Sequence, residues 1–309
     1  MNDYSALILG VVCAGIGGEL FVRGAVGLAS WARISPAIIG VTVAAFATSS
    51  PELSVAISAA VAGKPQITLG DALGSNVVNI ALILALALVI SGIQTPRDSI
   101  KRDFPVALLI PVLTGFLCLD GELSRFDGLL MLGMFCAWLA AVIREARNQR
   151  SVAAQVLGAQ RGWLTVLSCA AGLAFLGAAG SLIVAGARGI ALSFGLGEFI
   201  IGATVVAVGT SMPELATTLI AKYRGHDDVG LGTILGSNIY NGIFVIAIAA
   251  IISPIPVVWN EVSLALMFGV AALLLAYPAH DGFIGRWRGV LLLALYAVYL
   301  ALIYRPRPG

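Results

Sequence analysis

The sequence has few charged residues. Only 11% of its 309 residues are Asp, Glu, Lys or Arg, whereas 59% are hydrophobic and the mean hydropathy is +0.99. A soluble domain is about 25% charged, so this composition excludes a water-soluble globule. We predict an all-α integral membrane protein, and at about 20 residues per span the chain has room for roughly ten transmembrane helices. The net charge of +2 gives no indication of a nucleic-acid partner.

Several motifs of enzymes and ATP-driven pumps are missing. The sequence contains no GxxxxGK[ST], no GxSxG and no HExxH. The four cysteines stand alone in apolar runs, without a CxxC pair, and are interpreted as small core residues with no disulfide framework. We therefore expect no enzymatic activity, no cofactor and no obligate protein partner; the surroundings of the chain are the lipid bilayer.

Ten apolar segments are separated by short polar turns. They lie at residues 5–31, 36–61, 67–92, 104–119, 127–144, 162–190, 198–222, 229–253, 261–278 and 288–304. With ten spans, one set of alternate turns carries 12 Lys and Arg residues and the other set, with both termini, carries 5. Because positive charge concentrates on the cytoplasmic side, we expect a multi-pass protein of the inner (cytoplasmic) membrane with both termini outside.

The chain contains an internal repeat. IIGVTVAAFATSSPELSVAIS, which begins at Ile38, aligns without a gap with IIGATVVAVGTSMPELATTLI, which begins at Ile200. The match continues from LGDALGSNVVN to LGTILGSNIYN, and residues 38–80 share 20 identities in 43 positions with the second copy. Each half then holds five spans, an odd number, so the second half must enter the membrane from the opposite side. This inverted repeat is typical of secondary transporters, whose substrate site lies near the midplane. We expect one half at 1–150, with its motif at 38–80, and an inverted half at 151–309, with its motif at 200–242.

The two repeats each place one glutamate in the middle of an apolar span. Glu52 and Glu214 occupy equivalent positions, and no basic residue lies mid-span in the same helices. A carboxylate at that depth costs at least about 2.5–3.5 kcal/mol on insertion scales, so it indicates a functional site. Two copies that meet at one midplane predict a divalent anionic site.

Further oxygen atoms surround both glutamates. A threonine lies four residues before each glutamate with a serine beside it, and a serine and an asparagine are four residues apart in the next helix. These residues are Thr48, Ser49, Ser75 and Asn79 in the first half and Thr210, Ser211, Ser237 and Asn241 in the second half. Pro51 and Pro213 have no N–H and break the helices beside them. Carboxylate, hydroxyl, amide and carbonyl oxygens are hard ligands, which suit Ca²⁺ or Na⁺ and not zinc or copper.

The motifs ATSSPEL and GTSMPEL, each followed by GSNxxN, resemble the alpha repeats of the sodium/calcium exchanger superfamily, in particular its compact bacterial members. The resemblance covers essentially the whole chain. It implies a secondary antiporter that binds Na⁺ and Ca²⁺ alternately at one central cluster, with the first and sixth helices sliding across a fixed core. It assigns Ca²⁺ to Glu52 and Glu214, and completes the centre with Asn79 and Asn241. It assigns mainly Na⁺ binding to a set of hydroxyls and two backbone carbonyls. These are the side chains of Thr48, Ser49, Ser75, Thr210, Ser211 and Ser237, and the carbonyls of Ala45 and Ala207.

The sequence departs from that pattern at Asn241, where the sodium/calcium exchangers it resembles carry Asp. With only Glu52 and Glu214 ionised, three bound Na⁺ would leave an uncompensated positive charge in a low dielectric. We hypothesise fewer Na⁺ per Ca²⁺ than in the Asp-bearing relatives, or protons in place of Na⁺. Asp71 replaces an Asn common in the family and is an alternative source of the carboxylate, although a solvated helix start is the role we expect for it. Ala47, in place of the glycine at the equivalent Gly209, is expected to stiffen the first helix break.

Three other functions stay open at this point. The nearest is a proton-coupled Ca²⁺ exchanger on the same fold, which Asn241 favours, although GSNVVN does not resemble the acidic motif of such proteins. A passive cation channel is disfavoured, because duplicated buried carboxylates hold a divalent ion too tightly for fast conduction. A membrane scaffold without transport requires purely structural repeats.

Overall fold

The fold was analysed in a computed structural model that describes residues 3–32, 34–97, 99–153, 162–192 and 198–304. Part of the turn between the two halves, residues 154–161, lies outside the described residues. So do Arg33, Arg161, Arg305 and Arg307, which enter the expected charge asymmetry.

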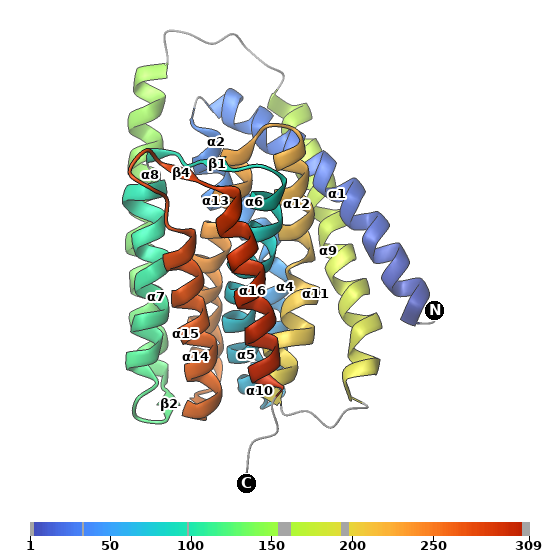
Figure 1. The fold of residues 1–309 in the computed structure, drawn as a ribbon, viewed down its shortest axis with the longest axis vertical. Coiled ribbons are helices and arrows are strands. Elements are labelled where there is room, and N and C mark those ends of the chain that lie inside the picture. Colours follow the sequence, from blue (N-terminus) through green and yellow to red (C-terminus); the bar gives the residue numbers. More distant parts are fainter. Residues whose placement is uncertain (1–2, 33, 98, 154–161, 193–197, 305–309) are drawn as a thin grey trace.

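The molecule is an elongated helical bundle (Figure 1), and the predicted all-α fold of ten spans is confirmed. In the first half the spans are α1 (Asp3–Ala32), α2 to α4 with the π-helical segment η1 (Pro36–Ile39, Gly40–Ala44, Ala45–Thr48, Ser50–Val61), α5, η2 and α6 (Pro65–Val77, Val78–Leu84, Ala85–Ile90), η3 with α7 (Ser99–Asp103, Phe104–Leu117) and α8 (Arg125–Ala153). In the second half they are α9 (Gly162–Leu192), α10 to α12 with η4 (Glu198–Ile201, Gly202–Val206, Ala207–Thr210, Met212–Tyr223), α13, η5 and α14 (Asp227–Ile239, Tyr240–Val245, Ile246–Ile252), α15 (Trp259–Ala276) and α16 (Arg286–Ile303). Five of these segments are unbroken, long and apolar enough to cross a bilayer, and two bent pairs raise that number to seven.

Two short strand pairs join the halves at opposite ends of the bundle. Strand β1 (Ile93–Gln94) pairs antiparallel with β4 (Phe283–Ile284), and β2 (Glu122–Leu123) pairs antiparallel with β3 (Ile255–Pro256). Figure 1 shows β1 and β4 at one end of the bundle and β2 at the other. Each half thus supplies one strand to each pair, and the repeat offset relates β1 to β3. This reciprocal exchange is what an inverted repeat requires.

The second span of each half bends where the proline motif occurs. The helix axis turns by 41° between Thr48 and Ser50, and by 49° between Thr210 and Met212. Proline stands in the first turn of the helix after each bend, where a missing N–H costs no hydrogen bond. The first break, which has Ala47 where the second has Gly209, is the less bent of the two.

The motif helices of one half pack against those of the other half. Helix α5 lies on η4 and α13 lies on η1, and both contacts need a glycine. A Cβ atom on Gly74 would stand 2.4 Å from the Ala203 carbonyl oxygen, and one on Gly236 would stand 2.5 Å from the Val41 carbonyl oxygen. Since any larger residue would push the helices apart, these glycines bring Ser75 and Ser237, which follow them, against the bends of the opposite half.

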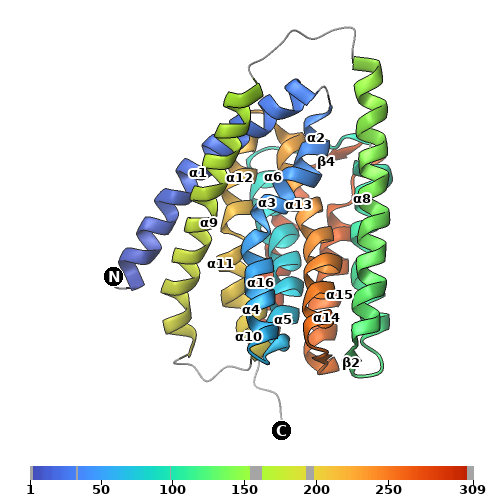
Figure 2. The ribbon, with the colours of Figure 1, turned by 180° about the vertical axis from the view of Figure 1, so that it is seen from behind.

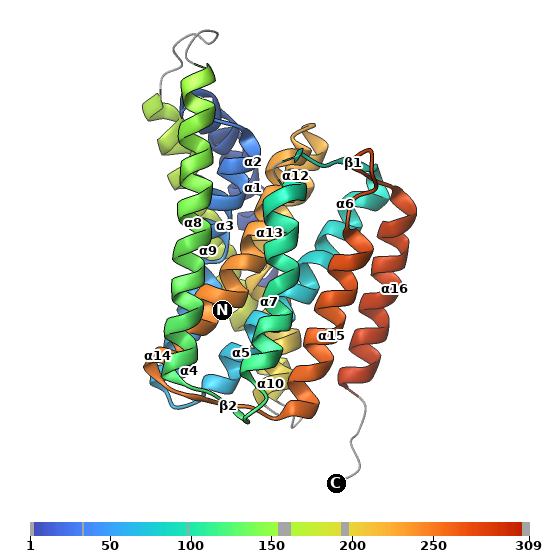
Figure 3. The ribbon, with the colours of Figure 1, turned by 90° about the vertical axis from the view of Figure 1, so that its left-hand side faces the viewer.

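The remaining helices surround this core. Helices α1 and α9 pack along each other on one flank, away from α7 and α8 (Figures 1 and 2). Helices α15 and α16 lie side by side on another face (Figure 3).

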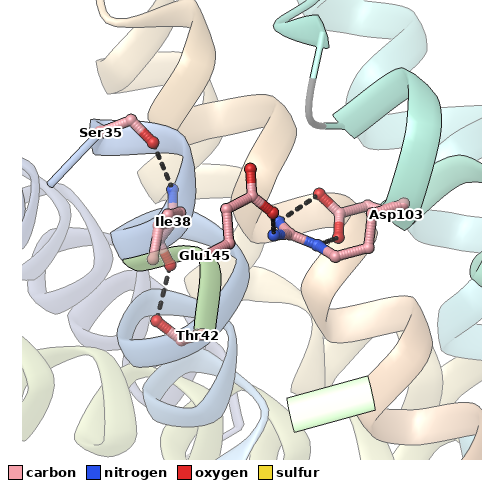
Figure 4. Close-up of polar contacts among 6 residues, drawn as sticks. Ser35, Ile38, Thr42, Asp103 and Glu145 are labelled. Atoms are coloured by element: carbon pink, nitrogen blue, oxygen red, sulfur yellow. Dashed lines mark hydrogen bonds and ion pairs between the residues drawn. The ribbon is translucent and has the colours of Figure 1, made fainter. Parts of the chain in front are cut away.

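At the end that carries β1 and β4, polar contacts fix the helix starts. The Ser35 hydroxyl accepts a hydrogen bond from the Ile38 N–H at 3.4 Å, and the Thr42 hydroxyl donates to the Ile38 carbonyl at 2.6 Å. Figure 4 shows Asp103 and Glu145 facing one guanidinium group. This group belongs to Arg102, which pairs with Asp103 at 2.8 Å and with Glu145 on α8, so the start of α7 is held against α8.

Candidate cation-binding site

The predicted site residues come together where the two bends meet α5 and α13. All of them are buried, and the ten polar side chains among them have no solvent-exposed area: Thr48, Ser49, Glu52, Ser75, Asn79, Thr210, Ser211, Glu214, Ser237 and Asn241. Ala45 and Ala207 are 1% and 0% exposed. The structure therefore assembles, inside the bundle, residues that lie up to 196 positions apart in the chain.

The first group of contacts is centred on Glu214 and is called the Glu214 cluster (Ala45, Thr48, Ser49, Glu214 and Ser237). The hydroxyls of Ser49 and Ser237 both donate to Glu214 Oε1, at 3.1 and 3.0 Å. The Thr48 hydroxyl lies 3.4 Å from that of Ser237 and also donates to the Ala45 carbonyl at 3.5 Å. The second-half glutamate is thus held by serines from both halves.

The second group is centred on Asp71 and is called the Asp71 cluster (Asp71, Ser75, Ala207 and Thr210). The hydroxyls of Thr210 and Ser75 donate to Asp71 Oδ1 at 3.1 and 3.5 Å. The single proton of the Thr210 hydroxyl has two alternative acceptors, the carbonyls of Val206 at 3.1 Å and Ala207 at 3.3 Å. The Ser75 hydroxyl lies 3.5 Å from the Ala207 carbonyl and 3.5 Å from the Thr210 hydroxyl. The two clusters use equivalent hydroxyls and equivalent carbonyls of the two repeats.

The expected solvated role of Asp71 is wrong. Its side chain has no exposed area, because α5 is enclosed by η4 and α4. The sequence carried a signal for this position, since Asp71 lies four residues before Ser75 and therefore shares its helix face.

Three asparagines join the two halves by hydrogen bonds. The Asn76 side-chain amide donates to the Asn238 carbonyl, and the Asn238 amide donates to the Asn76 carbonyl, both at 3.1 Å. Asn79 adds a hydrogen bond from its amide to Asn238 Oδ1 at 3.0 Å. Asn241 is fully buried, and its side-chain amide has no hydrogen-bond partner among the described residues. The sequence reasoning missed Asn76 and Asn238, although GSN occurs in both repeats.

Many oxygens in this centre have no hydrogen-bond partner among the described residues. They are Glu52 Oε1 and Oε2, Glu214 Oε2, Asp71 Oδ2, Asn79 Oδ1, Asn241 Oδ1 and Ser211 Oγ. Leaving a buried carboxylate oxygen unpaired is costly, and an ion or a proton is the usual compensation. These unpaired oxygens are therefore available as ligands for a cation.

Within the described ranges, no three His, Cys, Asp or Glu side chains lie close enough together to hold one metal ion. A cation here must then complete its shell with hydroxyl, amide and carbonyl oxygens. That donor set is the one that Ca²⁺ and Na⁺ use and that zinc does not.

Comparison with known proteins agrees with this chemistry. The family described as sodium/calcium exchanger protein matches residues 3–144 and 164–305. The chain is 32% identical over 311 residues to the inner membrane protein YrbG of Escherichia coli, covering 96% of this chain and 95% of YrbG. It is 28% identical over 357 residues to the sodium/calcium exchanger MaX1 of Methanosarcina acetivorans, with 98% of each chain covered. A structure of the sodium-calcium exchanger NCX_Mj, soaked with Na⁺ and Sr²⁺, superposes with a TM-score of 0.82 at 30% identity over 97% of each chain.

The ten-helix, two-repeat fold and its buried oxygen centre define a multi-pass membrane antiporter that exchanges Ca²⁺ and another cation. The chain belongs to the sodium/calcium exchanger family.

Proposed function

We propose that this protein exchanges Na⁺ for Ca²⁺ across a bacterial cytoplasmic membrane by alternating access. The observation that carries the proposal is the pair of repeat-related glutamates, Glu52 and Glu214, which are fully buried and retain unpartnered carboxylate oxygens. Two such charges balance one Ca²⁺ or two Na⁺, so either ion relieves the same electrostatic cost. An inward Na⁺ gradient then drives the expulsion of Ca²⁺.

The surrounding residues have distinct roles in this proposal. Glu52 and Glu214 ligate Ca²⁺, with amide oxygens from Asn79 and Asn241. The hydroxyls of Thr48, Ser49, Ser75, Thr210, Ser211 and Ser237, and the carbonyls of Ala45 and Ala207, serve mainly Na⁺. Hydroxyls suit exchange, because each one can donate to a carboxylate when the site is empty and offer a lone pair to a cation when it is full.

Access alternates when α1 and α9 slide as a pair over the core. In the structure these two helices contact each other along their length on one flank, and their contacts with the core are mostly with α12, α2 and α11. The contact of α9 with α11, which carries Ala207 and Thr210, couples this movement to the site. Shear of packed helices is an established kind of transporter motion.

The orientation follows from charge. The end that carries β1 and β4 includes Lys101, Arg102, Lys222, Arg224 and Arg286, and we propose that this end faces the cytoplasm and that both termini face outward. Reporter fusions at the two termini test this, and a cytoplasmic signal from either terminus contradicts it.

The function is tested by ⁴⁵Ca²⁺ uptake into proteoliposomes loaded with Na⁺ at equal pH on both sides. Uptake that requires internal Na⁺ supports the proposal. Uptake driven by a proton gradient without Na⁺ identifies instead the proton-coupled exchanger, which Asn241 favours. Uptake that needs no counter-ion, and persists at a rate set by the Ca²⁺ gradient alone, identifies a channel.

A further inference from the structure

We propose that Asp71 is a cation-binding residue, which adds a negative charge to the Na⁺ ligands Ser75, Thr210 and the Ala207 carbonyl. The inference rests on the proposed Na⁺ coupling and adds a third carboxylate to the transport site. It also replaces the lower Na⁺ stoichiometry expected from Asn241, which assumed that only two carboxylates were available.

The geometry of the cluster is that of a prepared ligand shell. Asp71 Oδ1 accepts hydrogen bonds from Thr210 and Ser75, while Asp71 Oδ2 is fully buried and has no partner among the described residues. The Ala207 carbonyl faces the same two hydroxyls. Helices α5 and α11 thus bring together one carboxylate, two hydroxyls and one carbonyl. Asp71 Oδ2 is the oxygen of this group that has no hydrogen-bond partner among the described residues.

The charge of this shell selects a monovalent ion. One carboxylate neutralises Na⁺, whereas Ca²⁺ at the same place would keep an excess positive charge in a low dielectric. The divalent ion is therefore left to the glutamates.

The equivalent position of the second repeat has no carboxylate, so it serves as a comparison. The residue equivalent to Asp71 is Thr233, which is also fully buried, and its hydroxyl donates to the Val229 carbonyl of its own helix at 2.8 Å. The neighbouring Ser237 hydroxyl donates to Glu214 instead.

In the first repeat Asp71 takes the Ser75 hydroxyl, which the symmetry would give to Glu52. Ser75, the equivalent of Ser237, donates to Asp71, and neither oxygen of Glu52 has a partner among the described residues. Asp71 consequently does two things, since it adds a charged ligand for Na⁺ and leaves Glu52 free for another cation.

The test compares full-length wild type with Asp71→Asn, which keeps the shape and the acceptor for Thr210 and Ser75 but removes the charge. Na⁺ binding is measured as the shift of thermal unfolding in detergent when NaCl replaces choline chloride at constant ionic strength, and Ca²⁺ binding is measured in the same way. We expect the Na⁺ half-saturation concentration to rise about tenfold or more and that of Ca²⁺ to change less than about threefold. In proteoliposomes the variant should move one Na⁺ fewer per Ca²⁺.

Two further variants make the result decisive. Asp71→Thr, which installs the residue that the fold accepts at position 233, should behave as Asp71→Asn does. Asp120→Asn removes an exposed aspartate of the turn before β2 and should leave both binding curves unchanged.

Superimposable Na⁺ curves for the wild type and both Asp71 variants overturn the assignment, and so does an equal loss of Na⁺ and Ca²⁺ binding. Wild-type Ca²⁺ uptake that ignores internal Na⁺ overturns the proposed function, and this outcome is visible without any variant. The two failures are therefore distinguishable.

Discussion

The two halves of the chain share a backbone plan but differ in the hydrogen bonds at their glutamates. Glu214 accepts two serine hydroxyls, one from each half, whereas both oxygens of Glu52 lack a partner in the described part of the chain. The polar side chains of the predicted site are identical in the two repeats, whereas Asp71, which lies beside them, has Thr233 as its counterpart.

The presence of Asp71 in the first repeat alone changes the acceptor to which the neighbouring hydroxyls donate. With an aspartate one turn away, Ser75 and Thr210 donate to Asp71, and the equivalent Ser237 donates to Glu214. Duplication creates a symmetric frame, and a single buried charge is enough to make its two cation environments chemically unequal. Variants of equivalent residues should therefore have unequal effects wherever this asymmetry matters.

The largest effect is expected from the glutamates. Glu52→Gln and Glu214→Gln should each lower Na⁺-driven ⁴⁵Ca²⁺ uptake by about 100-fold or more, because each removes a charged ligand. Without Na⁺ or Ca²⁺, thermal unfolding should separate them: Glu52→Gln raises stability by removing an unpartnered buried charge, whereas Glu214→Gln weakens two hydrogen bonds. Glu122→Gln, in the exposed part of β2, is the control, and equal uptake by all three variants would show that Glu52 and Glu214 are not the transport site.

A tenfold difference is expected between two equivalent serines. Ser49→Ala removes a charge-assisted hydrogen bond to Glu214, a contact worth about 1.5–3 kcal/mol, and should weaken Ca²⁺ binding about tenfold. Ser211→Ala removes a hydroxyl without a partner among the described residues and should change Ca²⁺ binding by less than about threefold. Ca²⁺ titration of thermal unfolding measures both, and equal losses would show that the empty-state asymmetry does not persist in the bound state.

A smaller effect concerns the asparagines that join the halves. Asn76→Ala and Asn238→Ala each break the reciprocal pair, at a cost of about 1–3 kcal/mol for the buried groups left unsatisfied. Asn238→Ala should cost more, because Asn79 also loses its acceptor. The melting temperatures of the two variants, with exposed Asn260→Ala as the control, measure this difference, and a larger loss in Asn76→Ala would refute it.

The spans and most of the site could be predicted because their signals are local. The length of an apolar segment predicts a membrane helix. The gap-free repeat identifies Glu52 and Glu214 as equivalent residues without any knowledge of their contacts. The burial of Asp71 could not be predicted in this way, because a carboxylate near a helix start looks the same whether the helix meets water or another helix. What decides it is the approach of α5 to η4 across Gly74, a tertiary contact between the halves. The Asn76–Asn238 pair escaped prediction for the same reason, since an amide and a main-chain carbonyl 162 residues apart leave no pattern in either repeat.

The smallest expected effect concerns the two bends, which differ by the residue at Ala47 and Gly209. Ala47→Gly makes the first break like the second, which is bent by 49° instead of 41°. Glycine within a helix costs about 1 kcal/mol relative to alanine, so the variant should unfold at a slightly lower temperature. Ala59→Gly, in the same span beyond the bend, has a comparable helix cost and no connection to the break. If the stiffer first break limits transport, only Ala47→Gly will change the rate of ⁴⁵Ca²⁺ exchange; equal rates in the two variants would show that the bends are fixed parts of the core and that the movement resides in α1 and α9 alone.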